Sequence, residues 1–258
     1  MKRLPTLLAA LVTLVALAGC GGDEPGTSGR TTDGAPAETL DLSVYFLLEG
    51  KVWPVRRTVE RTPAVATASL EELLAGPTDE ERDELSLSTA IPEDAEVVSL
   101  AVQDGVAQVA FSTPLPNAAL AQVIYTLTQF PSVDSVELLE GGVAIPGFDR
   151  SDYEDVTPAI LVESPRFFEE VGNPVRVQGT ANTFEATFQY ELTDTDGRIV
   201  DEGFVTATSG SGTRGTFDFT TKRYEVPFDG VGALTVFELS AKDGSRTNLR
   251  EIPIRMSR

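Results

Sequence analysis

Residues 116–133 read PNAALAQVIYTLTQFPSV and carry the clearest periodic pattern of the chain. A spacing of three and four residues between apolar side chains places them on one face of a helix, and Pro131 cannot continue a helix. The stretch therefore predicts an amphipathic helix that ends before Pro131. Five apolar residues follow the spacing i, i+3, i+4, i+7 and i+10, and these are Leu120, Val123, Ile124, Leu127 and Phe130.

The residues around this helix predict a mixed α/β domain over residues 40–148. Asp104-Gly105 is typical of a two-residue hairpin turn, and alternating apolar residues flank it on both sides. Thr62-Pro63 predicts the start of an earlier helix as cap and first-turn proline, and Gly76-Pro77 predicts its end. Strands are expected in the remaining apolar runs, at 42–48, 52–59 and 135–139.

The chain beyond this domain is predicted to be all β. Residues 149–157 are polar and acidic without a period, so we place a linker there. No helical pattern follows in residues 158–258. Short strands at this spacing with Gly and Asp turns indicate a β-sandwich of the immunoglobulin type, so the predicted fold class is α+β. Seven strand-like runs carry this prediction, at 159–163, 175–178, 184–192, 199–208, 217–219, 233–240 and 249–254.

The N-terminus predicts export and lipid attachment. Lys2 and Arg3 precede a short uncharged run that ends in Leu-Ala-Gly-Cys20, which has the layout of a secretory signal over residues 1–19. This ending resembles the lipobox of bacterial lipoproteins, which implies that Cys20 carries the lipid anchor at the extracytoplasmic face of the cell membrane. Residues 20–39 are rich in Gly, Pro, Ser and Thr and predict a flexible tether.

Composition excludes several classes of function. The formal net charge of −20 makes nucleic acid an unlikely ligand, because an acidic surface repels phosphate. Acidity also favours solubility, which is the simpler interpretation of the charge. Cys20 is the only cysteine, so no disulfide within the chain and no cysteine redox chemistry are expected.

The sequence offers few groups for catalysis, and we expect a protein that is not an enzyme and needs no cofactor. It has no histidine, which removes the commonest general base and the usual zinc ligand. A glycosidase that uses only carboxylates stays open as an alternative. Asp194-Thr195-Asp196-Gly197 could begin a calcium loop, but Val205 stands where such a loop needs a glutamate, so we expect a hairpin turn and no metal site.

Three aromatic residues are candidate interface anchors. Trp53 and the pair Phe167 and Phe168 are of the residue types that are enriched at the centres of protein interfaces. Packing in the core of this chain is the alternative for each of them.

Two stretches of the chain resemble known domain families. Residues 44–142 resemble the GerMN domain of spore germination and related lipoproteins, and residues 159–255 are similar to the immunoglobulin-like Gmad2 domain that often follows it. The matching motifs of the first are LLAGP at 73–77 and TLTQFPSV at 126–133, and those of the second include VQGTA at 177–181 and AKDG at 241–244.

This resemblance implies a role in germination or in cell-envelope assemblies, and it implies no catalytic or cofactor residues. We therefore expect a membrane-anchored lipoprotein that contacts other envelope proteins. A ligand-binding lipoprotein for a cell-wall fragment or a transporter substrate is the main alternative. The sequence does not predict the oligomeric state.

Overall fold

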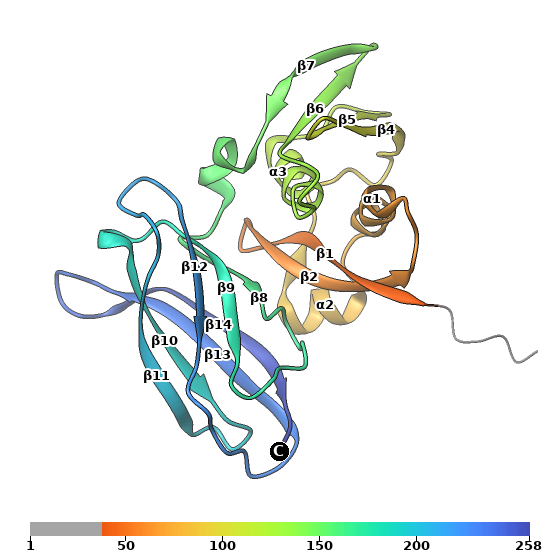
Figure 1. Ribbon diagram of the computed structural model, residues 1–258. Helices are drawn as coiled ribbons and strands as arrows, with labels where there is room; N and C mark the ends of the chain where they lie inside the picture. Colours follow the sequence, from red (N-terminus) through yellow and green to blue (C-terminus); the bar gives the residue numbers. More distant parts are fainter. Residues whose placement is uncertain (1–37) are drawn as a thin grey trace, which may run out of the picture. The chain divides into compact units, whose positions relative to one another are not determined.

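The computed structural model of the protein describes residues 38–258, and Ala37–Arg258 form one compact unit (Figure 1). Residues 39–148, the N-terminal region, contain two sheets with helices α1 and α3 between them. One sheet has the strand order β2-β1-β3 and the other the order β4-β5-β6-β7. The strands are β1 (Thr39–Leu48), β2 (Lys51–Glu60), β3 (Leu87–Ser88), β4 (Val97–Gln103), β5 (Val106–Phe111), β6 (Ser135–Glu140) and β7 (Val143–Phe148), and the helices are α1 (Val65–Ala75), α2 (Asp79–Leu85) and α3 (Asn117–Leu127).

Helix α3 forms as predicted, and it connects two parallel strands. It joins β5 to β6, which pair in parallel, and it lies between their sheet and strand β1 (Figure 1). All residues from 121 to 127 are buried, so the helix is enclosed on both sides instead of exposing a polar face. The expectation of a single buried face is therefore wrong for this helix.

The polar residues of α3 are buried because they satisfy the backbone of β1. Strand β1 pairs with β3 only at Leu47 and Leu48, so the rest of that edge lacks a neighbouring strand. The Gln122 amide donates to the carbonyl of Tyr45 at 3.0 Å, and the Thr126 hydroxyl accepts from the Tyr45 N–H at 3.1 Å. Gln129 both accepts from and donates to the backbone of Ser43. Buried polar groups need such partners, and here a helix supplies them to a strand.

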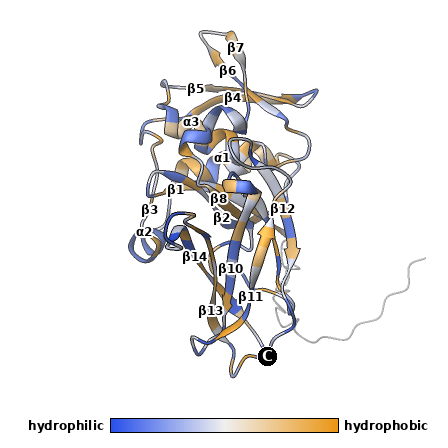
Figure 2. Cartoon of the chain, turned by 90° about the vertical axis from the view of Figure 1, so that its left-hand side faces the viewer, coloured by the Kyte–Doolittle hydropathy of each residue, from blue (hydrophilic) through white to orange (hydrophobic). Residues whose placement is uncertain are grey.

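Other elements of the N-terminal region differ from the predictions in detail. The hairpin is confirmed, with Asp104 and Gly105 both at positive φ between β4 and β5. Helix α1 begins at Val65, after the predicted Thr62-Pro63, and the Thr62 hydroxyl accepts from the N–H of Ala64. Helix α2 was not expected, because its sequence DEERDEL has no apolar period and is coloured as hydrophilic in Figure 2. A capping box formed by Thr78 and Glu81 starts it instead.

Residues 160–256, the C-terminal region, form a seven-stranded sandwich, as predicted. One sheet has the order β12-β9-β8 and the other β11-β10-β13-β14. Gly179 allows the close approach of β9 to β8, because a Cβ there would lie 2.0 Å from the carbonyl oxygen of Leu161. The strands are β8 (Ile160–Ser164), β9 (Arg176–Ala181), β10 (Thr187–Thr193), β11 (Ile199–Thr206), β12 (Gly215–Thr220), β13 (Gly230–Leu239) and β14 (Arg246–Met256).

The start of the third predicted strand is wrong. Phe184 alternates with the apolar residues of β10 in sequence, but it lies in a short 3-10 helix, η2 (Phe184–Ala186), and its side chain is exposed. Glu185 and Ala186 have positive φ, which breaks the extended backbone before Thr187. Alternation alone does not reveal such a break.

Candidate functional site

The segment predicted as a polar linker is a structured junction. Residues Arg150–Val156 form a 3-10 helix, η1, that begins with a capping box between Asp149 and Asp152. Tyr153 is buried and packs edge-on to Phe148 with 6.2 Å between ring centroids. The polar residues at 149–157 therefore have internal partners, which a charge pattern in the sequence does not show.

Arg150 joins the two regions through one guanidinium group. It lies over the rings of Tyr125 and Tyr45, at 4.6 and 5.5 Å from their centroids. It donates to the carboxylate of Glu163 on β8 at 2.8 Å, and Tyr45 donates to the same oxygen. It also donates to the Thr128 hydroxyl at 2.7 Å. A single side chain thus contacts β1, α3 and the first strand of the sandwich.

The electrostatics of this junction keep Arg150 charged. Burial by itself would lower the pKa of Arg150, but Tyr45 and the Glu163 carboxylate outweigh it, and the pKa is raised. Burial, reinforced by the negative charge of Glu163, raises the pKa of Tyr45 well above its usual value. The tyrosine therefore stays a neutral hydrogen-bond donor, and the only charges of the cluster are one cation and one carboxylate.

A second set of bonds joins η1 to the sandwich and to β2. Arg214 donates to both carboxylate oxygens of Glu154, at 2.8 and 2.9 Å, and Asn182 donates to the same group at 2.8 Å. Burial would raise the pKa of Glu154, but the hydrogen bonds from Arg214 and Asn182 lower it. Lys51 of β2 donates to the carbonyl of Asp155 at 2.5 Å. Helix η1 is therefore hydrogen-bonded both to the sandwich and to β2 of the N-terminal region.

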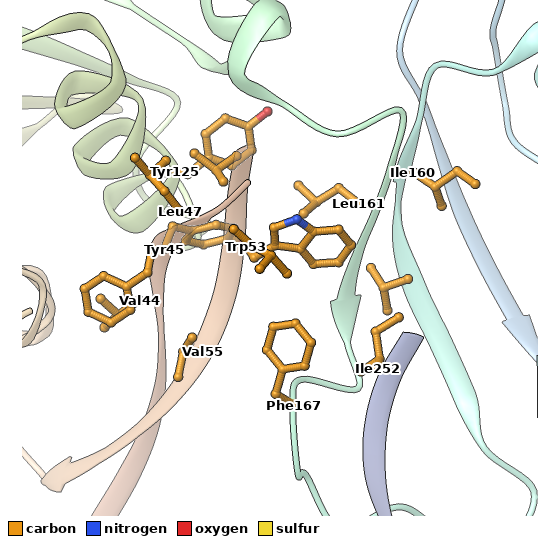
Figure 3. Close-up of a cluster of buried hydrophobic side chains, with 14 of the residues drawn as sticks. Val44, Tyr45, Leu47, Trp53, Val55, Tyr125, Ile160, Leu161, Phe167 and Ile252 are labelled. Atoms are coloured by element: carbon orange, nitrogen blue, oxygen red, sulfur yellow. The ribbon is translucent and has the colours of Figure 1, made fainter. Parts of the chain in front are cut away.

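The apolar part of the junction contains two of the candidate interface anchors. Trp53 is 2% exposed and Phe167 is 8% exposed, and their rings pack 6.0 Å apart (Figure 3). Figure 3 also shows Leu161 and Ile252 of the sandwich beside this pair. Both anchors lie in the interior of this chain, as the core-packing alternative describes. Phe168 is half-buried at φ 57°, with the Arg255 guanidinium 5.8 Å from its ring centroid.

The remaining predicted site residues give no catalytic arrangement. Cys20, the predicted site of lipid attachment, lies outside the described residues. The Asp194 carboxylate accepts from the N–H groups of Asp196 and Arg198, each at 2.9 Å, as a hairpin turn requires. Within residues 38–258, no three acidic, histidine or cysteine side chains gather as a metal site would need, and no helix there is long and apolar enough to cross a membrane.

A hollow of about 550 Å³ opens beside the junction, lined in part by Lys51, Asn182 and Arg250. Its polar groups are mostly bonded to one another: Arg250 donates to Glu49 at 2.7 Å, Asn182 to Glu154, and Lys51 to the backbone of Asp155. A binding site for a polar ligand would need such groups to be free. The hollow therefore gives little support to a ligand-binding role.

The charges of the N-terminal region form a pattern that sequence reasoning missed. Between Arg82 and Arg150 the chain has no lysine, arginine or histidine, and it has ten aspartates or glutamates. This stretch contains the whole sheet β4-β5-β6-β7 and helix α3. Counting charges along the sequence would have found it. The surface of this sheet therefore carries only negative charge.

Comparison with protein families agrees with this architecture. Residues 43–145 match the family described as sporulation and spore germination, and residues 159–245 match the immunoglobulin-like domain of bacterial spore germination. No curated protein matches the chain.

Two solved structures from Bacillus subtilis are similar to parts of the chain. The first GerMN domain of the sporulation protein GerM is 24% identical, with a TM-score of 0.33, over 41% of this chain and 86% of that one. The tandem GerMN domains of GerM are 20% identical, with a TM-score of 0.37, over 73% of this chain and 62% of theirs. Because both TM-scores are low, the assignment of the two regions rests on the family matches.

Proposed function

Since the chain belongs to the bacterial proteins that join a GerMN domain to a Gmad2 domain, we propose a non-enzymatic role for it in an envelope assembly of the germination type. Both families are described by sporulation and germination and not by a chemical reaction. In this role the chain is anchored through lipid on Cys20 and makes contacts with other envelope proteins.

The bonded junction is the observation that carries this proposal. Arg150 and Glu154 fix the two regions through Glu163 and Arg214, and Trp53 packs against Phe167 between them. A protein that spaces or orients partners needs its binding surfaces in one fixed arrangement, because interfaces that must order on binding lose affinity. An enzyme or a transport receptor would instead need free polar groups converging on a cleft.

The anchor raises the effective concentration for partners in the same membrane. The tether proposed from the composition of the residues between Cys20 and β1 would span about 20 to 25 Å root-mean-square. Tethering within this distance strengthens binding to membrane partners without any new contact. The proposed contacts can therefore be individually weak.

In-cell crosslinking of the wild-type chain and of Cys20→Ser tests this function. We expect the wild-type chain to remain membrane-bound after a high-salt wash and to crosslink reproducibly to envelope proteins. The variant should be released and lose most of these crosslinks, because it lacks the acylation site. Retention of Cys20→Ser in the washed membrane would contradict the anchor. Release of muropeptides by the purified chain, abolished by one Asp or Glu substitution, would contradict the non-enzymatic role.

A further inference from the structure

Strand β4 is an open edge of its sheet. It is the terminal strand of the sheet β4-β5-β6-β7 and pairs only with β5. Within residues 38–258, no hydrogen bond links residues 97–103 to any element besides β5. Val98 is 67% exposed and Val102 is 41% exposed. Exposed edges of this kind are places where another strand can add.

Three other terminal strands, β11, β14 and β7, show how this fold protects an edge. β11 turns the carboxylate of Asp201 inward, where Tyr190 and Lys222 hold it. The end of β14 is covered by residues 168–171, which bond to the backbone of Pro253 and Arg255. β7 contains a proline. Inward charges, coverage, proline and β-bulges are known means of blocking strand addition. β4, with the sequence VVSLAVQ, has none of the first three, and its one register shift against β5 lies at its start, between Val97 and Ser99.

The charges at both ends of β4 select the occupant. Glu96 precedes the strand and Asp104 follows it, and both are exposed. The ion pairs of residues 38–258 leave both carboxylates without a basic side chain. A second copy paired antiparallel about Leu100 would set Glu96 opposite Asp104 at each end, and like charges directly opposite are destabilising. Self-association through this edge is therefore disfavoured.

We propose that the free edge of β4 binds an extended segment of a partner protein that has an uncharged centre and lysine or arginine at both ends. The segment adds a fifth strand to the sheet. Main-chain hydrogen bonds provide affinity in such strand addition, and alternate side chains provide specificity. Leu100 and Val102 pair with the buried Val109 and Ala107, so they lie on the face toward the helices. The segment should carry apolar residues at the positions beside them.

This inference rests on the proposed role in protein contacts, and it has a separate test in purified protein. The chain from residue 20 onward, carrying Cys20→Ser, is titrated with a synthetic peptide of alternating valine and serine flanked by two lysines at each end. A second peptide has glutamates in place of the lysines. Hydrogen exchange of the complex locates the binding site. We expect binding of the lysine-flanked peptide, added protection at residues 97–103, and no binding of the other peptide.

Charge substitution at one end of the strand provides the matched variant. Glu96→Lys should weaken the lysine-flanked peptide about five-fold, because one cross-strand attraction becomes a repulsion. Glu96→Gln should have a smaller effect. The side chain of Glu96 is exposed and makes no bond in the structure, and unchanged thermal unfolding will verify that the variants fold.

Three results would overturn the inference. Equal binding of both peptides would contradict the requirement for lysine or arginine at both ends of the bound segment. Protection away from residues 97–103, or no binding of either peptide, would remove the site. Dimerisation of the wild-type chain with added protection from hydrogen exchange at residues 97–103 would make a second copy the occupant. Crosslinks to envelope proteins in cells would still support the proposed function in each case, so the two failures are distinguishable.

Discussion

The C-terminal sandwich and the sheet β4-β5-β6-β7 of the N-terminal region use charge in opposite ways. The C-terminal region has ten lysines or arginines, and seven of them form ion pairs: Arg166, Arg176, Arg198, Arg214, Lys222, Arg246 and Arg250. The sheet β4-β5-β6-β7 lies in a stretch with no basic residue at all. The sandwich therefore neutralises much of its charge within the chain, whereas the sheet has no basic side chains of its own to pair with its carboxylates.

This difference separates the sandwich, as the supporting part of the chain, from the sheet β4-β5-β6-β7, as the part that is available for contacts. Charges that are bonded internally contribute to one conformation, and charges that are left free contribute to the field that a partner meets. The edges follow the same division, because β11 is protected by Asp201 and β4 is open. The junction at Arg150 connects the supporting part to the contact part.

The largest effect should come from breaking the apolar junction. Trp53→Ala removes a buried side chain that packs between the two regions, and we expect the free energy of unfolding to fall by about 3 to 5 kcal/mol. Urea unfolding measures this change. It is followed by circular dichroism, because Trp53 is the only tryptophan and its replacement removes the tryptophan fluorescence signal. Phe204→Ala is the control, because Phe204 is 74% exposed. Hydrogen exchange in β8 that does not change in Trp53→Ala would show that the regions are independent.

A smaller loss should follow from removing the guanidinium of the junction. Arg150→Ala deletes its bonds to Glu163 and Thr128, and we expect a destabilisation of about 2 to 3 kcal/mol. Exchange at residues 150–156 should rise most. Arg150→Lys keeps the charge but lacks the planar guanidinium group. Its free energy of unfolding should therefore lie between those of wild type and Arg150→Ala. If hydrogen exchange in η1 is as slow in Arg150→Ala as in wild type, Arg150 does not hold the regions together.

The sequence predicted the elements whose pattern is local. The i, i+3, i+4 spacing placed α3, and Asp104-Gly105 placed the hairpin of β4 and β5. It did not predict that Gln122 and Thr126 are buried, because their partners on β1 are about 80 residues away in the chain. The strand alternation that included Phe184 failed for a related reason, since positive φ at the next residue does not show in alternation.

The candidate site was harder to predict than the fold. Residues 149–157 look like a linker in composition, but Arg150 and Glu154 are paired with Glu163 and Arg214 of other elements, which lie far away in the sequence. Trp53 and Phe167 were predicted as candidate interface anchors with core packing as the alternative, because sequence cannot tell an interface within a chain from one between chains. The absence of cations from Arg82 to Arg150 was readable from the sequence and needed only a local charge count.

Acid should weaken the C-terminal region through its internal carboxylates. Burial would raise the pKa of Asp201, but hydrogen bonds from Lys222 and Tyr190 outweigh it, and the pKa is lowered. A lowered pKa in the folded state gives stability that is present above the unfolded value of about 3.9 and is lost as the pH falls through the folded value. Asp201→Asn should cost about 1 to 2 kcal/mol at pH 7.

The same substitution should also flatten the dependence of stability on pH below pH 4. Unfolding by urea at pH 7 and at pH 3 measures both effects, and Glu202→Gln, at an exposed side chain of the same strand, serves as the control. If wild type and Asp201→Asn lose the same free energy between these two pH values, the internal carboxylate is not the source of the acid sensitivity.

The smallest effect should come from adding a cation to the sheet that lacks one. Gln108 on β5 lies directly opposite Glu137 on β6 and donates to its carboxylate at 2.8 Å. Gln108→Lys replaces this bond by an opposite-charge pair, which stabilises cross-strand neighbours by about 0.2 to 1 kcal/mol. Gln108→Glu should destabilise by a similar amount. Thermal unfolding at low and high salt measures both, and salt should bring the two variants together because exposed charges are screened. A lysine that destabilises this sheet would mean that the missing cations reflect a need of the fold and not a surface left free for a basic partner.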